Sequence, residues 1–134
     1  MNIFPNQACP CDSGQSYKNC CQVLHKGGKA ASPEALMRSR YSAYTLHLAA
    51  YIMKTTHPDG PQYNPDPVAW KRAIELFCQN TRFERLQILA VQGDMVTFRA
   101  TLFAHQRDVS FTEMSVFRQH NGQWKYYSGT QLEH

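Results

Sequence analysis

Four cysteines fall within the short N-terminal stretch CPCDSGQSYKNCC, and the rest of the 134-residue chain holds one more. They form two close pairs, Cys9 with Cys11 and Cys20 with Cys21, and eight residues separate the pairs. A cluster of this kind is a disulfide framework, a redox motif or a metal site. Because the first 32 residues show no apolar periodicity, the chemistry of these sulfurs decides how the segment folds.

Metal binding explains the cluster better than the two alternatives. A disulfide between the adjacent Cys20 and Cys21 would be strained, and the C-x-x-C spacing of redox motifs is absent. Four soft thiolates in one short turn can complete a tetrahedral structural site, for which zinc is the usual ion. We therefore expect a structural Zn²⁺ bound by Cys9, Cys11, Cys20 and Cys21. His25 is an alternative ligand to Cys21.

The sequence contains no visible signal for secretion or membrane insertion. The opening MNIFPNQ lacks basic and apolar signal regions, and no stretch approaches the ~20 apolar residues of a membrane span. An odd number of cysteines, five, fits a reducing compartment, so we expect a cytoplasmic protein. The net charge of +4 falls to about +2 when four thiolates bind one dication. Charge alone therefore gives little support to a nucleic-acid partner.

Helix signals occupy the first half of the chain after the cysteines. Ser32-Pro33-Glu34 combines an N-cap serine, a first-turn proline and an acidic residue, which is typical of a helix start. Apolar residues then recur at helical spacing from Met37 to Ile52, over two helices that end before His57-Pro58. Asp66-Pro67 begins a further helix, and one face of it carries Trp70, Ile74, Phe77 and Cys78.

After Thr81 the apolar period changes from helical to alternating. The stretch ERLQILAVQ meets MVTFRATLFA across Gly93-Asp94, which predicts a hairpin. The stretch VSFTEMSVFRQ meets WKYYSGT across a longer turn built around Asn121-Gly122. Helices followed by a four-stranded antiparallel meander predict an α+β fold.

The second hairpin also predicts which side chains face the interior. Its register sets Phe117 opposite Tyr126 and Gln119 opposite Trp124, and alternation adds Glu113 to the same face. A buried carboxylate needs a partner, and Arg38 and Arg40 on the first helix are the expected cations, with Tyr41 and Tyr44 as donors. The group is either a structural ion pair, which is the more common case, or the floor of a pocket. The pocket candidates are Glu113, Arg40, Tyr44, Trp124 and His57.

The cysteine stretch resembles the SEC-C motif, C-P-C-G-S-G-K-x-Y-K-x-C-C/H, and departs from it at Asp12 and Gln15. The further stretches PEALMRSRYSAY, HP and FTEMSVFRQHNGQWKYYSG are similar to the YchJ-like proteins of bacteria. This resemblance implies a zinc-binding SEC-C element over residues 1–30 and a nuclear transport factor 2-like cone over residues 31–131. We expect residues 132–134 to be the remnant of an expression tag.

Three functions fit these features. The first is a cytoplasmic adaptor whose zinc knuckle presents a surface to a partner protein, with a homodimer through the sheet. The second is a small-molecule-binding protein, or an isomerase- or hydratase-like enzyme, that uses a polar pocket in the cone. The third is an RNA- or ribosome-associated protein. No nucleophile elbow, P-loop, dinucleotide fingerprint or HExxH is present, so we expect binding rather than catalysis.

Overall fold

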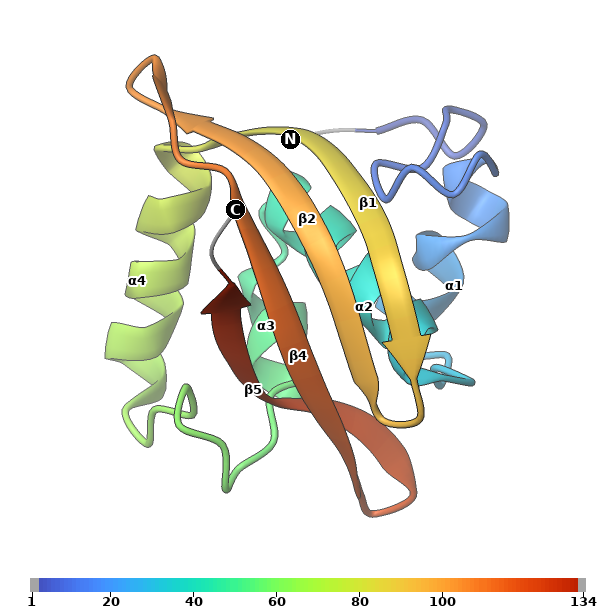
Figure 1. The fold of residues 1–134 in the computed structure, drawn as a ribbon, viewed down its shortest axis with the longest axis vertical. Helices are drawn as coiled ribbons and strands as arrows, with labels where there is room; N and C mark the ends of the chain where they lie inside the picture. Colours follow the sequence, from blue (N-terminus) through green and yellow to red (C-terminus); the bar gives the residue numbers. More distant parts are fainter. Residues whose placement is uncertain (1–2, 133–134) are drawn as a thin grey trace.

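The computed structural model describes residues 3–132 as a curved antiparallel sheet with helices on its inner side (Figure 1). The N-terminal segment contains the 3₁₀-helix η1 (Tyr17–Asn19) and the short helix α1 (Cys21–His25). Three longer helices follow, namely α2 (Pro33–Thr45), α3 (Ala49–Lys54) and α4 (Pro67–Gln79). The strands are β1 (Arg82–Gln92), β2 (Met95–Ala104), β3 (Arg107–Asp108), β4 (Phe111–His120) and β5 (Gln123–Leu132).

Both predicted helix starts are confirmed. The Ser32 hydroxyl accepts a hydrogen bond from the Ala35 amide at 3.1 Å, directly before the first-turn proline of α2. The Asp66 carboxylate accepts from the amides of the second and third residues of α4, at 3.2 and 3.1 Å. These caps satisfy amides that have no partner inside the helix, so local sequence fixes where both helices begin.

The sheet has the predicted meander order β1-β2-β4-β5, and all the pairs are antiparallel. Asn121 and Gly122 have φ of +52° and +77° and form a two-residue turn, shorter than the predicted one. This geometry is the tight hairpin turn that matches strand twist. The strand β3, which pairs with β2, was not predicted because two residues are too few to show a period.

The register predicted for β4 and β5 is confirmed. Phe117 pairs with Tyr126, Gln119 pairs with Trp124, and a bulge after Val116 increases the bend of the ribbon. Strand β5 continues to Leu132, one residue beyond the predicted end of the fold, because backbone pairing does not depend on which side chain is present. Residues 133–134 of the predicted tag remnant lie outside the described residues.

The main buried cluster joins the N-terminal segment to the sheet. It includes Cys11 and Tyr17 together with Leu86, Val96 and Phe98 of the strands. In Figure 1 the N-terminal segment and α1, in blue, lie beside β1 and α2. The predicted boundary between residues 30 and 31 remains a prediction, but the two segments share one core.

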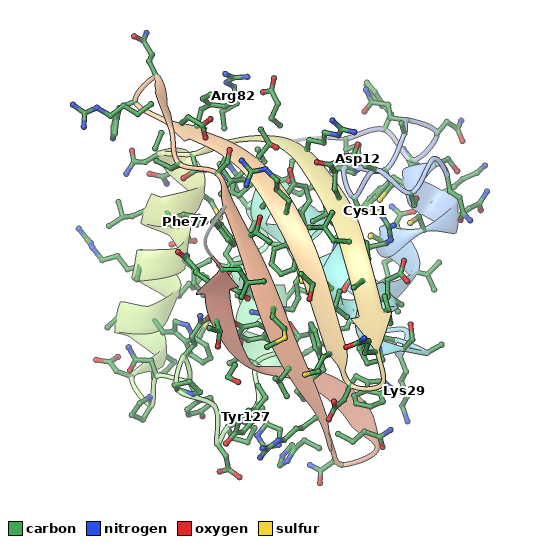
Figure 2. The ribbon with its side chains drawn as sticks, viewed as in Figure 1. Cys11, Asp12, Lys29, Phe77, Arg82 and Tyr127 are labelled. Carbon is green, nitrogen blue, oxygen red and sulfur yellow. The ribbon has the colours of Figure 1, made fainter. Side chains whose placement is uncertain are left out.

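A second buried cluster packs α3 against α4. It contains Ile52, Ile74 and Cys78, so Cys78 is a small core residue as the helical pattern predicted. Phe77, predicted on the same face, is instead 42% exposed; Figure 2 shows it on α4, on the side of the helix that faces the sheet. Among the described residues, no helix is long and apolar enough to cross a bilayer.

Candidate functional site

The four clustered cysteines come together in space. One sulfur from each of Cys9, Cys11, Cys20 and Cys21 lies within 4.8 Å of all the others. The Cys11–Cys20 and Cys20–Cys21 sulfur distances are 3.5 and 3.9 Å. A tetrahedral site with metal–sulfur bonds of ~2.3 Å has sulfur–sulfur edges of about 3.8 Å. The donor set therefore fits a four-coordinate ion bound by sulfur.

Two turns bring the cysteine pairs face to face. After the first pair, Asp12 and Gly14 adopt φ of +62° and +88°, which reverse the chain. The reversal is closed by the Cys9 amide, which donates to the Gln15 carbonyl at 2.8 Å. The second pair follows η1, and Cys21 is the first residue of α1. Asp12 thus adopts the left-handed backbone that glycine allows in the SEC-C pattern, which aspartate tolerates better than most residues.

The cluster is buried and holds negative charge poorly without a cation. Cys9, Cys11 and Cys21 are buried, and Cys20 is half-buried. Hydrogen bonds from Cys21 and Cys9 hold the pKa of the Cys11 thiol far below its usual range. The bond to Cys11 raises the pKa of Cys9 to about 12, and the same interaction raises that of Cys21. One thiolate is thus stable alone, and four thiolates together require a bound cation.

His25 lies outside the sulfur cluster, and both of its ring nitrogens are occupied. Its Nε2 donates to the Ser39 carbonyl of α2 at 2.8 Å, and its Nδ1 accepts from the Tyr17 hydroxyl at 2.6 Å. Burial lowers the pKa of this imidazole, which favours the neutral form that makes both bonds. The geometry gives His25 a structural role, as a link between the N-terminal segment and α2.

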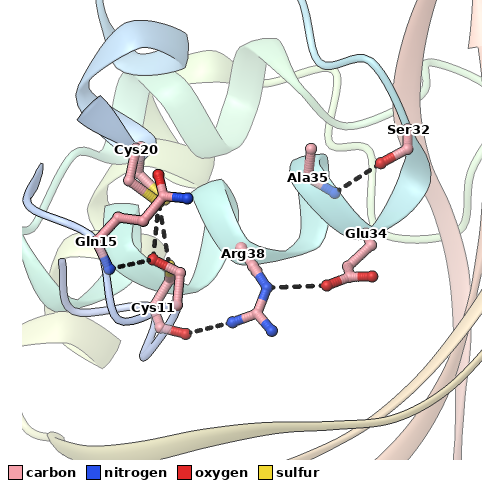
Figure 3. A network of polar contacts seen from close by, with 9 residues as sticks. Cys11, Gln15, Cys20, Ser32, Glu34, Ala35 and Arg38 are labelled. Carbon is pink, nitrogen blue, oxygen red and sulfur yellow. Dashed lines mark hydrogen bonds and ion pairs between the residues drawn. The ribbon is translucent and has the colours of Figure 1, made fainter. Parts of the chain in front are cut away.

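Arg38 also joins this segment to α2 (Figure 3). Its guanidinium donates to the Cys11 carbonyl at 2.8 Å and pairs with the Glu34 carboxylate at 3.1 Å. Arg38 was predicted as a cation for Glu113, and that prediction is wrong. The residue points toward the sulfur cluster, away from the face of α2 that carries Arg40.

A separate cavity of about 290 Å³ lies between α2, α4 and the inner face of the sheet. We call it the inner cavity. Of the predicted pocket residues, Arg40, Tyr44 and Glu113 line it, whereas His57 and Trp124 do not. The complete lining is Met37, Arg40, Tyr41, Tyr44, Gln62, Phe77, Phe83, Phe98, Ala100, Leu102, Phe111, Glu113, Tyr126 and Gln131.

His57 and Trp124 lie elsewhere for identifiable reasons. The His57 amide donates to the Tyr126 carbonyl, and its buried ring lies 5.1 Å from that of His120, centroid to centroid. The ring also lies 5.4 Å from that of Tyr127, centroid to centroid, so the imidazole packs against residues outside the cavity lining. Trp124 lines a smaller depression near the Gly27-Gly28 loop and packs against the main cluster.

The predicted ion pair between Glu113 and Arg40 does not form. Glu113 Oε2 accepts from the Ser115 hydroxyl at 2.5 Å and from the Tyr126 hydroxyl at 3.1 Å. One terminal amino group of Arg40 donates to the Ile52 carbonyl and to the Thr55 and Thr56 hydroxyls. The guanidinium is therefore held at the end of α3, where helix carbonyls attract a cation.

Tyr126 connects the two charged residues and was missed as a site residue. The Arg40 guanidinium carbon lies 4.6 Å from the centre of its ring, and its hydroxyl contacts Glu113. The predicted pairing of Tyr126 with Phe117 already placed it on the inner face, so the hairpin register could have found it. Gln62 could not be found in this way, because its proline-rich loop has no period.

Comparisons with known proteins agree with this architecture. Residues 32–129 match the family model of the YchJ middle NTF2-like domain, and residues 6–22 match that of the SEC-C motif. A UPF0225 protein of Deinococcus radiodurans is 38% identical over 91% of this chain and 88% of its own length. A UPF0225 protein of Pectobacterium carotovorum is 37% identical over 96% of this chain and 86% of its own length.

Solved structures share the fold. The solution structure of a SEC-C motif-containing protein from Rhodopseudomonas palustris has a TM-score of 0.77 and 32% identity, over 93% of this chain and 98% of that one. The crystal structure of a SEC-C motif-containing protein from Psychrobacter arcticus has a TM-score of 0.74 and 24% identity, over 99% and 87% of the two chains. Sequence match and fold together show that the chain belongs to the YchJ family of UPF0225 proteins, with a SEC-C motif followed by an NTF2-like domain.

Proposed function

We propose that this protein is a cytoplasmic adaptor in which a zinc-ordered N-terminal segment, residues 1–30, binds a partner protein. The observation that carries the proposal is the exposure of two large apolar side chains on that segment. Phe4 is 75% exposed and Val23 is 55% exposed, although they flank a cluster whose sulfurs turn inward. Apolar side chains held outward on an ordered segment are typical anchors for another protein.

Zinc is the ion that the donor set favours. Four thiolates are soft ligands, and a tetrahedral arrangement of sulfur selects zinc over magnesium or calcium. When bound, the ion would hold the two turns together, with all four positions taken by Cys9, Cys11, Cys20 and Cys21. No position would remain open for a substrate, so the expected role of the ion is structural.

A groove beside the cluster is suited to an extended partner segment. It measures about 660 Å³ and runs between the N-terminal segment and the start of α2. Val23 and Leu24 supply its apolar surface and Lys29 supplies positive charge, whereas Arg38 is paired there with Glu34. This composition favours a peptide with an apolar anchor and an acidic residue that can reach Lys29. A protein is favoured over RNA because the anchors are apolar and no run of cations is present.

The test is affinity capture with the zinc-loaded full chain, compared between two double variants. Phe4→Ser with Val23→Ser removes the proposed anchors, and both positions are exposed, so folding should be unaffected. Val68→Ser with Leu76→Ser removes equally exposed apolar side chains from α4 and is the matched control.

We expect a specific protein set that the wild type and the α4 variant retain and that the Phe4/Val23 variant loses. Synthetic peptides from the captured proteins should then bind the wild type directly. An identical set for all three chains would overturn the proposal. So would a set that disappears after nuclease treatment, which would indicate RNA as the partner.

A second copy of the chain is the partner that we propose for the sheet. Leu89 and Val91 are exposed on β1, at an edge of the sheet. Sedimentation analysis should show a dimer for the wild type and a monomer for Leu89→Ser with Val91→Ser. A monomer at all concentrations in the wild type would contradict this pairing.

A further inference from the structure

The inner cavity has mainly aromatic walls. The rings of Tyr44 and Phe83 are stacked with centroids 6.3 Å apart, and Phe77 meets both of them edge-on. Across the cavity Phe98 and Phe111 form a second edge-to-face pair at 6.0 Å. Flat rings bind well between such walls, because aromatic side chains favour offset and edge-on contacts.

One end of the inner cavity is polar and carries a buried cation. Arg40 is 3% exposed, and among residues 3–132 no carboxylate lies within 4.0 Å of its guanidinium. Three hydrogen bonds hold it in place, and all three use the same terminal amino group. The guanidinium lies over the Tyr126 ring, contacts the Tyr44 hydroxyl and borders the cavity. A buried arginine that is fixed but lacks a counter-ion can act as a hydrogen-bond donor to a ligand.

The same end also carries an acceptor. The Oε2 atom of Glu113 receives both hydrogen bonds, from Ser115 and Tyr126, and the described residues donate none to its Oε1 atom. Gln62 contacts the Tyr126 hydroxyl at 3.4 Å and lies at the mouth of the cavity. Arg40 and Glu113 therefore flank Tyr126 and give the polar end one positive and one negative charge. A charged ligand would be repelled by one of the two.

The cavity is too large to be an ordinary packing defect. About 290 Å³ corresponds to roughly ten water molecules at ~30 Å³ each, whereas voids larger than one water are rare in protein interiors. The exposed side chains of Phe77, Gln62 and Gln131 lie at its rim, so the cavity is accessible from solvent. The volume matches a single ring with short substituents, at the lower end of ligand-binding pockets.

We infer that the inner cavity binds a small aromatic molecule without net charge, which carries a carbonyl oxygen for Arg40 and a hydroxyl or N–H donor for Glu113. The ring packs between the phenylalanine pairs, and the polar substituents meet the two charged side chains beside Tyr126. This site shares no residue with the cysteine cluster and does not depend on the adaptor function.

Saturation-transfer NMR on the zinc-loaded full chain tests this inference. The probes are meta-hydroxyacetophenone, which is uncharged and has both substituents on one side of the ring, benzoate, which is an anion, and benzylamine, which is a cation. We expect the uncharged probe to bind in the millimolar range, as suits so small a molecule, and more tightly than the other two.

Three variants place the binding. Ala100→Leu adds bulk inside the cavity, and Ala90→Leu makes the same change at an exposed position on β1. Binding should be lost in Ala100→Leu and kept in Ala90→Leu. Glu113→Gln replaces the carboxylate with an amide of similar size and should weaken binding by about tenfold. If Ala100→Leu does not fold, this variant alone shows whether the probe binds in the cavity.

The inference is overturned by any of three results. The first is no saturable binding of meta-hydroxyacetophenone. The second is tighter binding of benzoate or benzylamine, which would exclude the uncharged class. The third is equal binding to the wild type, Glu113→Gln and a folded Ala100→Leu, which would place the probe at another surface. The capture experiment on the N-terminal segment is independent of whether the probe binds in the cavity.

Discussion

The carboxylate of Asp12 accepts a 2.8 Å hydrogen bond from the backbone amide of Leu86. The turn that follows Cys9 and Cys11 is thereby linked to β1 (Figure 2). Strand β1 lies at an edge of the sheet, where its outward amides have no neighbouring strand. The SEC-C pattern has glycine at this position, and glycine could adopt the same backbone angle but not make the bond. The substitution thus adds a contact between the N-terminal segment and the sheet.

Replacing Asp12 should separate the contribution of the hydrogen bond from that of the backbone angle. Asp12→Gly should lower the free energy of unfolding by about 1 kcal/mol, because the buried Leu86 loses its amide partner. Asp12→Ala should lower it by about 1 kcal/mol more, because alanine resists a φ of +62°. Urea unfolding of the three proteins measures both differences. Equal stability of the two variants would show that the angle contributes nothing.

Removing one sulfur should remove the metal. Cys11→Ser should abolish stoichiometric zinc, because three thiolates and a hydroxyl bind zinc far more weakly than four thiolates. The melting temperature should fall by roughly 10 °C or more, since metal-binding energy is part of the folding energy. Elemental analysis and calorimetry make the two measurements. Cys78→Ser, which changes a cysteine outside the cluster, is the control and should keep its metal.

His25→Gln should keep the metal and lose stability. The His25 bonds to Tyr17 and Ser39 are weakened, which should lower the free energy of unfolding by about 1–2 kcal/mol at neutral pH. Loss of zinc from this variant would instead identify His25 as a ligand.

The stability difference between wild type and His25→Gln should also depend on pH. Burial lowers the pKa of His25 below the unfolded value of 6.5, so the unfolded chain binds the extra proton first. The advantage of the wild type is therefore complete above pH 6.5 and is lost as the pH falls below it. Parallel unfolding curves at several pH values measure this, and a difference that grows toward acid pH would contradict it.

Five tyrosines, four of them buried and Tyr44 half-buried, should make the fold sensitive to alkali. Burial raises the pKa of Tyr17 to about 12 and also raises those of Tyr41, Tyr44, Tyr51 and Tyr126 above 10. In the unfolded chain these groups ionise near pH 10, so their stabilising effect is complete below pH 10 and is lost as the pH rises above it. Tyrosinate absorbance and circular dichroism should change together in one alkaline transition. Ionisation of these residues without loss of structure would contradict the prediction.

Gly129→Ala should displace Glu113. A Cβ at position 129 would overlap the Glu113 carboxylate and lie 2.6 Å from the Tyr126 hydroxyl. We expect a loss of about 1–3 kcal/mol, as for other overpacked interiors. In a Glu113→Ala background the same change should cost clearly less, because the carboxylate is gone and only the Tyr126 hydroxyl remains too close. Urea unfolding of the four proteins gives the coupling energy, and additive effects would contradict this account.

Local sequence codes predicted much of the fold and part of the cavity. The caps at Ser32 and Asp66 fixed two helix starts, because they depend only on residues in the first turn. The Asn121-Gly122 turn fixed the register of β4 and β5, and with it the inward position of Glu113. The spacing of the cysteines predicted that their four sulfurs converge.

The partners of the arginines could not be predicted in this way. Arg38 and Arg40 lie two positions apart on one helix, so their side chains leave it in different directions. Whether either side chain reaches Glu113 depends on how α2 and α3 pack. In this packing Arg40 donates to the Ile52 carbonyl of α3 instead. The position of His57 likewise depends on residues far away in the sequence, because its amide donates to the Tyr126 carbonyl and its ring packs on His120 and Tyr127.

The sulfurs of Cys9, Cys11 and Cys21 belong to the same buried cluster as Val96 and Phe98 of the sheet. Without the ion, the cysteine part of this shared core would be disordered, and the loss of packing would extend from the N-terminal segment to the sheet. Supply of the ion would then set how long the whole protein survives proteases, so depletion of the metal would shorten the lifetime of the entire chain.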